Sequence, residues 1–503
     1  MKFVLPCSAF MIFQHAMIFF LKRLCIVSLL VSFVFLTGCP PQRPVKKEKK
    51  KSPVEVAKAD EAKGQAPQPA EKAPPQPAPK PDPKQQAKPA PKPAEQTAPK
   101  PVPKPAQPAP KPVPPMTAEE EAVKALVERL GEARNTFKPS DARAINELSI
   151  NTDVLNVEDV QLIAKLKGLE KLSFSDCRDF TDEYTKELLP LADSLTFLKI
   201  GNSRITKDSA ETLSEFSKLT ELNIEKNAGI KDAACQFIAK MEKLERLNMI
   251  YTGLTETGLM TLRKLPNLQA LDIRGCTMIA DSGMKNVARI KTLKSFQHYS
   301  SSVSDAGLEA LTAAENIESL YLQDFRLTDA AGQSLKKFSR LTSLQLFRCS
   351  EFGSQGLLEL KGMPLTRLTL RGLSSLGNDG FEVFRELPTL KRLYLTELQA
   401  VSDAAFLPLA ELKNLEILEV EIIPGVTDEA LKSIAKLQNL RELKLRSVGI
   451  TDAGLDEILK LPKLTSLQLL DLAGIDDAAA KEKFAKKNYK TLTIGKTKGE
   501  LQE

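Results

Sequence analysis

The chain has 503 residues, and 42% of them are hydrophobic, which is enough to bury a large core. Trp is absent and only two His residues occur, so metal sites built from several histidines of one chain are excluded. The net charge of +7 divides into +3 over residues 1–38, +9 over 39–115 and −5 over 116–503. Nucleic-acid binding needs a basic footprint on the folded part of the chain, and that part is acidic.

Residues 1–38 are predicted to be an export signal. A basic pair at 22–23 precedes an apolar run over 25–36, which is about the length found in signal peptides. The run ends in the sequence LTGC, which resembles a bacterial lipobox. That resemblance implies cleavage between Gly38 and Cys39, with acyl chains on Cys39 that hold the protein at a membrane facing the periplasm or the cell exterior.

Two alternatives stay open at this end of the chain. The apolar stretch 3–21 could join the later run in an uncleaved transmembrane anchor. Translation could also begin at Met17, because 38 residues is long for such a signal.

Residues 39–116 are predicted to be a disordered tether. Positions 40–115 hold 24 of the 33 prolines, mixed with Lys, Ala and Gln. Proline has no backbone N–H and a fixed φ, so the segment cannot build a packed core. In polyproline II form it would reach roughly 240 Å at about 3.1 Å per residue. A semi-rigid spacer is expected, whose lysines could also engage anionic lipid or cell wall.

Residues 117–140 are predicted to be a helical cap that covers the N-terminal end of a series of repeats, which begins after it. Thr117 and Glu120 have the spacing of a capping box, in which each side chain accepts from the other's backbone N–H. Apolar residues then recur on one helical face, at Val123, Leu126, Val127 and Leu130.

Residues 141–495 repeat the pattern LxxLxL at steps of 24 to 26 residues. A weaker copy at Ile145 precedes the strong copies, a terminal strand near Tyr489 closes the series, and 496–503 is expected to be a frayed tail. The strong copies begin at Leu169, Leu195, Leu219, Leu244, Leu268, Leu293, Ile317, Leu341, Leu365, Leu390, Leu415, Leu440 and Leu464. The count is about fourteen repeats plus a final strand.

The second half of each repeat is predicted to be helical. In ITDAGLDEILKLPK, Thr451 or Asp452 can cap a helix whose apolar face carries Leu455, Ile458 and Leu459. The alternate leucines of each strand and this helical face would bury each other. The expected fold is an α/β solenoid, curved like a horseshoe, with a parallel sheet on its concave face and helices on its convex face.

These repeats resemble the leucine-rich repeat family, in its cysteine-containing subtype. DCRDFTDEYTKEL, RGCTMIADSGM and FRCSEFGSQGL match that subtype best. The family is best known for binding proteins. Some eukaryotic relatives add an F-box, and no such extra domain is visible in this sequence.

The ninth position of each repeat departs from the usual Cys or Asn. It is mostly polar at first and then wholly apolar, which predicts a polar ladder giving way to hydrophobic packing in the last five turns. The residues are Asp153, Cys177, Ser203, Asn227, Thr252, Cys276, Ser301, Phe325 and Cys349, and then Leu373, Leu398, Ile423, Val448 and Leu472.

The sequence gives little support for a catalytic or metal-binding site. There is no HExxH, P-loop, GxSxG or GxGxxG after a strand. His298 replaces an inward Leu and is expected to be structural, and four cysteines (Cys177, Cys235, Cys276 and Cys349) are expected to be buried without disulfides or zinc. An Asp recurs at helix starts, from Asp182 to Asp452, and capping is favoured over calcium binding. No cofactor is expected.

The concave face is the candidate binding surface. Tyr and Arg, which dominate binding hot spots, gather at its outward positions in the middle repeats. The candidate residues are Arg274, Tyr299, Tyr321, Gln323, Phe347, Arg371, Arg392 and Tyr394. A solvated sheet face with incidental aromatics is the alternative.

The predicted function is a lipid-anchored, monomeric scaffold that binds a protein or peptide of unknown identity through its concave face. A structural role is the alternative, in which the basic tether engages cell wall or anionic lipid and organises the envelope. An enzyme of unknown type is a distant third.

Overall fold

The computed structural model describes residues 115–130, 145–151 and 154–497. Every described residue falls in one compact unit, Gln107–Glu503. The predicted signal, the predicted lipidation site at Cys39 and nearly all of the predicted tether lie outside the described residues. Within the described ranges, no helix is both long and apolar enough to cross a membrane.

One parallel sheet runs through this unit, with its 15 described strands hydrogen-bonded in chain order. The strands are β1 (Glu147–Asn151), β2 (Lys171–Ser175), β3 (Phe197–Gly201), β4 (Glu221–Asn223), β5 (Arg246–Asn248), β6 (Ala270–Asp272), β7 (Ser295–Tyr299), β8 (Ser319–Gln323), β9 (Ser343–Phe347), β10 (Arg367–Arg371), β11 (Arg392–Thr396), β12 (Ile417–Glu421), β13 (Glu442–Arg446), β14 (Ser466–Leu470) and β15 (Thr491–Gly495). The sequence predicts about fourteen repeats and a final strand, and the last described strand, β15, lies next to Tyr489.

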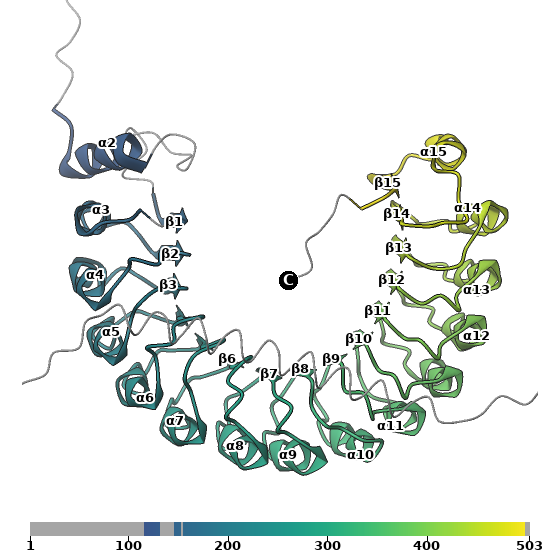
Figure 1. Ribbon diagram of the computed structural model, residues 1–503, viewed down its shortest axis with the longest axis horizontal. Coiled ribbons are helices and arrows are strands. Elements are labelled where there is room, and N and C mark those ends of the chain that lie inside the picture. The colour runs from purple at the N-terminus through teal and green to yellow at the C-terminus, as the bar shows by residue number, and fades with distance from the viewer. Residues whose placement is uncertain (1–114, 131–144, 152–153, 498–503) are drawn as a thin grey trace, which may run out of the picture. The chain divides into compact units, whose positions relative to one another are not determined.

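Short helices connect the strands and lie on the outer side of the sheet, which lines the inner, concave side (Figure 1). They are α2 (Ala118–Leu130), α3 (Val157–Ile163), α4 (Asp182–Glu187), α5 (Lys207–Leu213), α6 (Asp232–Ile238), α7 (Glu256–Leu262), α8 (Asp281–Val287), α9 (Asp305–Leu311), α10 (Ala331–Lys336), α11 (Ser354–Leu358), α12 (Phe406–Leu409), α13 (Asp428–Ile434), α14 (Leu455–Leu459) and α15 (Asp477–Ala485). Tighter 3-10 turns form η3 (Leu189–Leu191), η4 (Asn378–Glu386), η5 (Asp403–Ala405) and η6 (Asp452–Gly454).

The core lies between the sheet and the helices. Strand side chains alternate between the two faces, so the inner leucines of each LxL point to the helices while their neighbours face the concave side. Leu344, Leu368 and Leu393 lie side by side in register and are fully buried. The predicted register and the predicted α/β leucine-rich-repeat solenoid are thus confirmed.

Helix α2 covers the first repeat at the N-terminal end of the described sheet. The predicted capping box is present: the Thr117 N–H donates to Glu120 (2.7 Å) and the Glu120 N–H donates to the Thr117 hydroxyl (3.3 Å). Val123 and Leu126 are buried, and Val127 packs against the core. The rest of the predicted cap, residues 131–140, lies outside the described residues.

The ninth positions behave as predicted in most of the described repeats, but Ser301 is exposed, and the adjacent Ser300 is buried and donates to the Ile279 carbonyl (3.0 Å). Asp153 lies outside the described residues. The Asn227 amide donates to the Ile200 carbonyl (2.7 Å) of the preceding repeat, and its oxygen accepts from the Ser203 N–H (2.9 Å). In the last five turns the apolar residues pack instead: Leu373, Leu398, Ile423 and Val448 are buried, and Leu472 is half-buried near the C-terminal end.

The aspartates at the helix starts do something other than the predicted capping of their own helices. Thr or Ser directly before the Asp is the cap in several repeats; Thr451, which precedes Asp452, accepts from the Ala453 N–H. The Asp carboxylate instead binds the cap residue of the next repeat, through that residue's N–H and hydroxyl. The pairs are Asp182–Thr206, Asp232–Thr255, Asp281–Ser304, Asp305–Thr328, Asp403–Thr427 and Asp428–Thr451.

Candidate binding surface

The predicted residues share one face because they occupy alternate positions of neighbouring strands. Tyr299 on β7 lies beside Gln323 on β8, Gln323 beside Phe347 on β9, and Phe347 beside Arg371 on β10. Adjacent strands lie about 4.8 Å apart, so these four side chains form a continuous row across the concave face. The register predicted from the repeats therefore brings four of the eight candidates into line.

Tyr321 is the centre of a first group on this face. Its ring stacks on Phe347 with centroids 4.6 Å apart and planes tilted by 28°. The Arg274 guanidinium lies 5.0 Å from the same ring centroid, and the Tyr321 hydroxyl donates to Gln323. Burial raises the pKa of Tyr321, and the charge of Arg274 opposes that rise. We call Arg274, Tyr321, Gln323 and Phe347 the aromatic group.

Arg274 is held in place by a second partner. Its guanidinium pairs with Asp272 (2.8 Å), whose carboxylate also accepts from the Arg274 backbone N–H (3.2 Å). Asp272 is only 9% exposed, so few water molecules can compete for its hydrogen bonds with Arg274. Arg274 is thereby fixed beside Tyr321, and less rotamer entropy remains to be lost on binding.

A second group lies on β10 and β11. The Arg367 guanidinium sits 4.8 Å from the Tyr394 ring centroid, while Arg371 pairs with Glu397 (2.9 Å). Arg392 is exposed beside Arg367 in the register of the two strands. Arg371, Arg392 and Tyr394 thus belong to an arginine-rich region next to the aromatic group. Seven of the eight candidates fall into these two groups, and the eighth, Tyr299, lies beside Gln323.

Sequence reasoning missed Arg348 and Asp324, which flank the aromatic group. Arg348 pairs with Asp324 through two hydrogen bonds of 2.7 Å each. Each residue directly follows a strand and has a positive φ, 50° for Arg348 and 57° for Asp324. A position-by-position comparison of the repeats could have found them, because the same place is left-handed in many repeats; the strand pattern alone does not include it.

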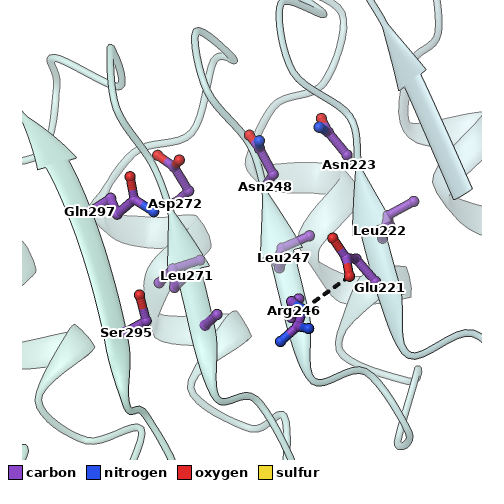
Figure 2. Close-up of a pocket in the computed structure, with 11 residues that line it drawn as sticks. Glu221, Leu222, Asn223, Arg246, Leu247, Asn248, Leu271, Asp272, Ser295 and Gln297 are labelled. Atoms are coloured by element: carbon purple, nitrogen blue, oxygen red, sulfur yellow. Dashed lines mark hydrogen bonds and ion pairs between the residues drawn. The ribbon is translucent and has the colours of Figure 1, made fainter. Parts of the chain in front are cut away.

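A shallow depression of about 160 Å³ lies on the same face over β4 to β7, and it was not predicted (Figure 2). The Asn223 and Asn248 side chains accept from backbone N–H groups two residues later, both at 3.0 Å. These bonds compete with the strand ladder, so β4 and β5 are only three residues long. Arg246 bonds Glu221 across the floor (2.9 Å), and both polar residues, such as Ser295 and Gln297, and apolar residues, such as Leu247 and Leu271, line the remainder.

His298 has the structural position predicted for it. It is fully buried, and its Nδ1 lies 3.1 Å from the Ile273 carbonyl. Burial lowers the pKa of His298 to about 4, so the ring is neutral near neutral pH. The four cysteines are buried as well. Among the described residues, no group of three His, Cys, Asp or Glu side chains has the geometry to hold a metal ion.

Comparisons with known proteins agree on the repeat type. A leucine-rich repeat family model matches residues 264–288. A Trypanosoma equiperdum protein named "Putative adenylate cyclase regulatory protein" is 29% identical over 138 residues, which are 27% of this chain and 21% of that protein. The chain therefore spans about a fifth of that relative's length.

Two solved structures are similar to the chain. An internalin from Listeria monocytogenes has a TM-score of 0.46 and 17% identity, over 76% of this chain and 95% of that one. A chain of the yeast Rad7 and Elc1 complex has a TM-score of 0.46 and 18% identity, over 71% of this chain and 93% of that one.

Proposed function

We propose that this leucine-rich repeat solenoid is a binding scaffold that holds a protein or peptide partner on its concave face. The observation that carries the proposal is the aromatic group. Tyr321, Phe347 and Arg274 are half-buried, mutually packed and in contact with solvent on an otherwise polar sheet. Tyr and Arg in such settings dominate the energy of protein interfaces.

Preorganisation supports the same reading. Ordering a long side chain at an interface costs about 0.5–1.5 kcal/mol. Arg274 and Tyr321 already have fixed partners in Asp272, Phe347 and Gln323, so less of that cost remains when a partner binds. A solvated face with incidental aromatics would not need these contacts.

The test is capture of a partner from a membrane extract of the source cells by the full chain. Replacing Tyr299, Tyr321 and Tyr394 together by Ala should abolish capture while circular dichroism stays unchanged. Tyr251→Ala is the matched control, because Tyr251 is an exposed tyrosine outside both groups. Unchanged capture by the triple variant would refute the proposed surface.

We further propose that the protein is exported and lipid-anchored at Cys39, as the lipobox-like LTGC sequence indicates. Metabolic labelling with an alkyne fatty acid in a bacterial host tests this. The wild type and Cys25→Ser should carry label, and Cys39→Ser should carry none. Label retained by Cys39→Ser would exclude this anchor.

A further inference from the structure

Two polar groups on β10 are buried on the concave face without a hydrogen-bond partner. They are Nε of Arg367 and Oγ1 of Thr369. Thr369 is only 8% exposed, and it lies two residues from Arg367 on the same face of the strand. Buried polar groups are nearly always paired, and leaving one unpaired costs about 1–3 kcal/mol.

The charges around these two groups favour an anion. Arg348 and Arg371 are neutralised by Asp324 and Glu397, whereas Arg367 and Arg392 have no carboxylate within 4 Å among the described residues. The nearest acidic neighbour along the row is Glu419 on β12, beside Tyr394, and Lys444 lies 3.9 Å from it. Two unpaired guanidinium groups thus meet on adjacent strands of a unit whose net charge is negative.

An apolar surface lies within reach of this cationic pair. The Tyr321–Phe347 stack spans β8 and β9, and Arg367 and Arg392 lie on β10 and β11. The centres of the two pairs are two strand spacings (about 10 Å) apart across the sheet and about three residues (about 10 Å) apart along the strands, so they lie roughly 14 Å from each other. In an extended, strand-like peptide, residues i and i+4 are on the same side and about 13 Å apart, which matches this distance.

We propose that the concave face recognises an acidic peptide segment, with one carboxylate held by Arg367, Arg392 and Thr369 and an apolar side chain on the Tyr321–Phe347 stack. This rests on the proposed binding function and specifies the chemistry of its partner. The carboxylate accepts from the Arg367 Nε–H and from the Thr369 hydroxyl, so it satisfies both buried groups. The guanidinium of Arg392 adds charge from the solvent side.

The probe is a synthetic peptide carrying Phe-Thr-Thr-Thr-Glu, with matched peptides that carry Gln for Glu or Gly for Phe. Binding to the full chain is read from ¹³C resonances of labelled tyrosine, with those of Tyr321 and Tyr394 assigned by their Phe variants. Both resonances should shift with the Phe-Thr-Thr-Thr-Glu peptide. Each matched peptide should bind at least about tenfold more weakly, a loss of about 1.4 kcal/mol.

Protein variants then locate the anion site. Arg367→Gln with Arg392→Gln should weaken binding by about tenfold or more, and Thr369→Val by roughly three- to tenfold. Arg246→Gln is the matched control, because Arg246 occupies the same strand position on β5, and it should stay within about twofold of wild type.

The outcomes separate the two proposals. Equal binding of the Glu and Gln peptides, or no effect of the Arg367/Arg392 pair, overturns the anion site. Inorganic phosphate shifting Tyr394 at the peptide's own concentration overturns the peptide assignment. If binding also survives Tyr321→Ala, the proposed concave-face function fails with it; if only Tyr321→Ala abolishes binding, that function stands without the anion site.

Discussion

The carboxylate of Asp182 accepts two hydrogen bonds from Thr206 of the next repeat, one from the backbone N–H (2.8 Å) and one from the hydroxyl (2.7 Å). The Ser209 N–H (3.1 Å) and hydroxyl also donate to it. Burial alone would raise the pKa of Asp182, but these hydrogen bonds outweigh it and lower the pKa. The bonds link helix starts of successive repeats, so they stabilise the stacking that each repeat depends on.

Asp182→Ala should weaken the contact between its repeat and the next by about 2–3 kcal/mol, because several donors lose a charged acceptor. Asp208→Ala is the control: Asp208 also lies in the first turn of its helix, one position further in than Asp182, but its side chain pairs with the exposed Lys207. Its loss should cost less than about 1 kcal/mol. Hydrogen exchange at the Thr206 and Ser209 amides measures the difference. Equal protection in the two variants would refute the stabilising role of the Asp182 hydrogen bonds.

The same aspartate hydrogen bonds explain why the ITDAGL motif contains a glycine. A Cβ on Gly454 would lie 2.2 Å from Oδ1 of Asp428, the atom that accepts from the Thr451 N–H. Gly454→Ala should therefore destabilise the C-terminal repeats by about 1–3 kcal/mol through overpacking. The matched change Gly377→Ala meets its nearest atom at 3.2 Å and should cost less than about 1 kcal/mol. Thermal melting of both variants gives the comparison, and similar midpoints would contradict the steric reading.

His298 should make stability depend on pH. Its pKa is about 4 in the folded chain, against an ordinary value of 6.5, because burial disfavours the charged ring. Between these values the unfolded chain binds a proton that the folded chain does not, so stability falls as pH drops from 6.5 towards 4. The loss is about 3 kcal/mol at most, from about 1.4 kcal/mol per pKa unit.

The control for this prediction is His298→Leu, which introduces the residue that the next four repeats have at this place. Subtracting its melting curve at each pH from that of the wild type removes the contribution of the carboxylates. A difference that does not change over this pH range would show that the ring is not buried as a neutral base.

The sequence predicts the fold well because the information is local to each repeat. The LxxLxL period sets the register, and the register sets which side chains are buried and which share a row, as Tyr299, Gln323, Phe347 and Arg371 do. The prediction for the aspartates at the helix starts was wrong because it considered each repeat separately. Their hydrogen bonds join residues 23 or 24 positions apart, in successive repeats. Within a single repeat, the only role visible for an Asp at a helix start is that of a cap.

The residue types of the candidate surface could be predicted from the sequence, but the pairing of its charged side chains could not. Strand alternation identifies Arg371, but its carboxylate partner Glu397 directly follows a strand in a left-handed position outside the pattern, as do Arg348 and its partner Asp324. Only the three-dimensional arrangement shows that Arg371 is neutralised and Arg367 is not. The depression over β4 and β5 was missed for a similar reason, because side-chain bonds of Asn223 and Asn248 shorten those strands.

The pairing of Arg274 with Tyr321 can be measured without knowing the partner. Burial raises the pKa of Tyr321, and the nearby cations Arg274 and Arg348 lower it again. Arg274→Gln removes the cation beside the ring, so the pKa of Tyr321 should rise further. Titration of ¹³C-labelled tyrosine by NMR follows this shift, with Arg246→Gln as a control because Arg246 bonds Glu221 on distant strands. An unchanged Tyr321 titration in Arg274→Gln would mean that the guanidinium does not rest on the ring in solution, and the preorganisation argued for this surface would fail with it.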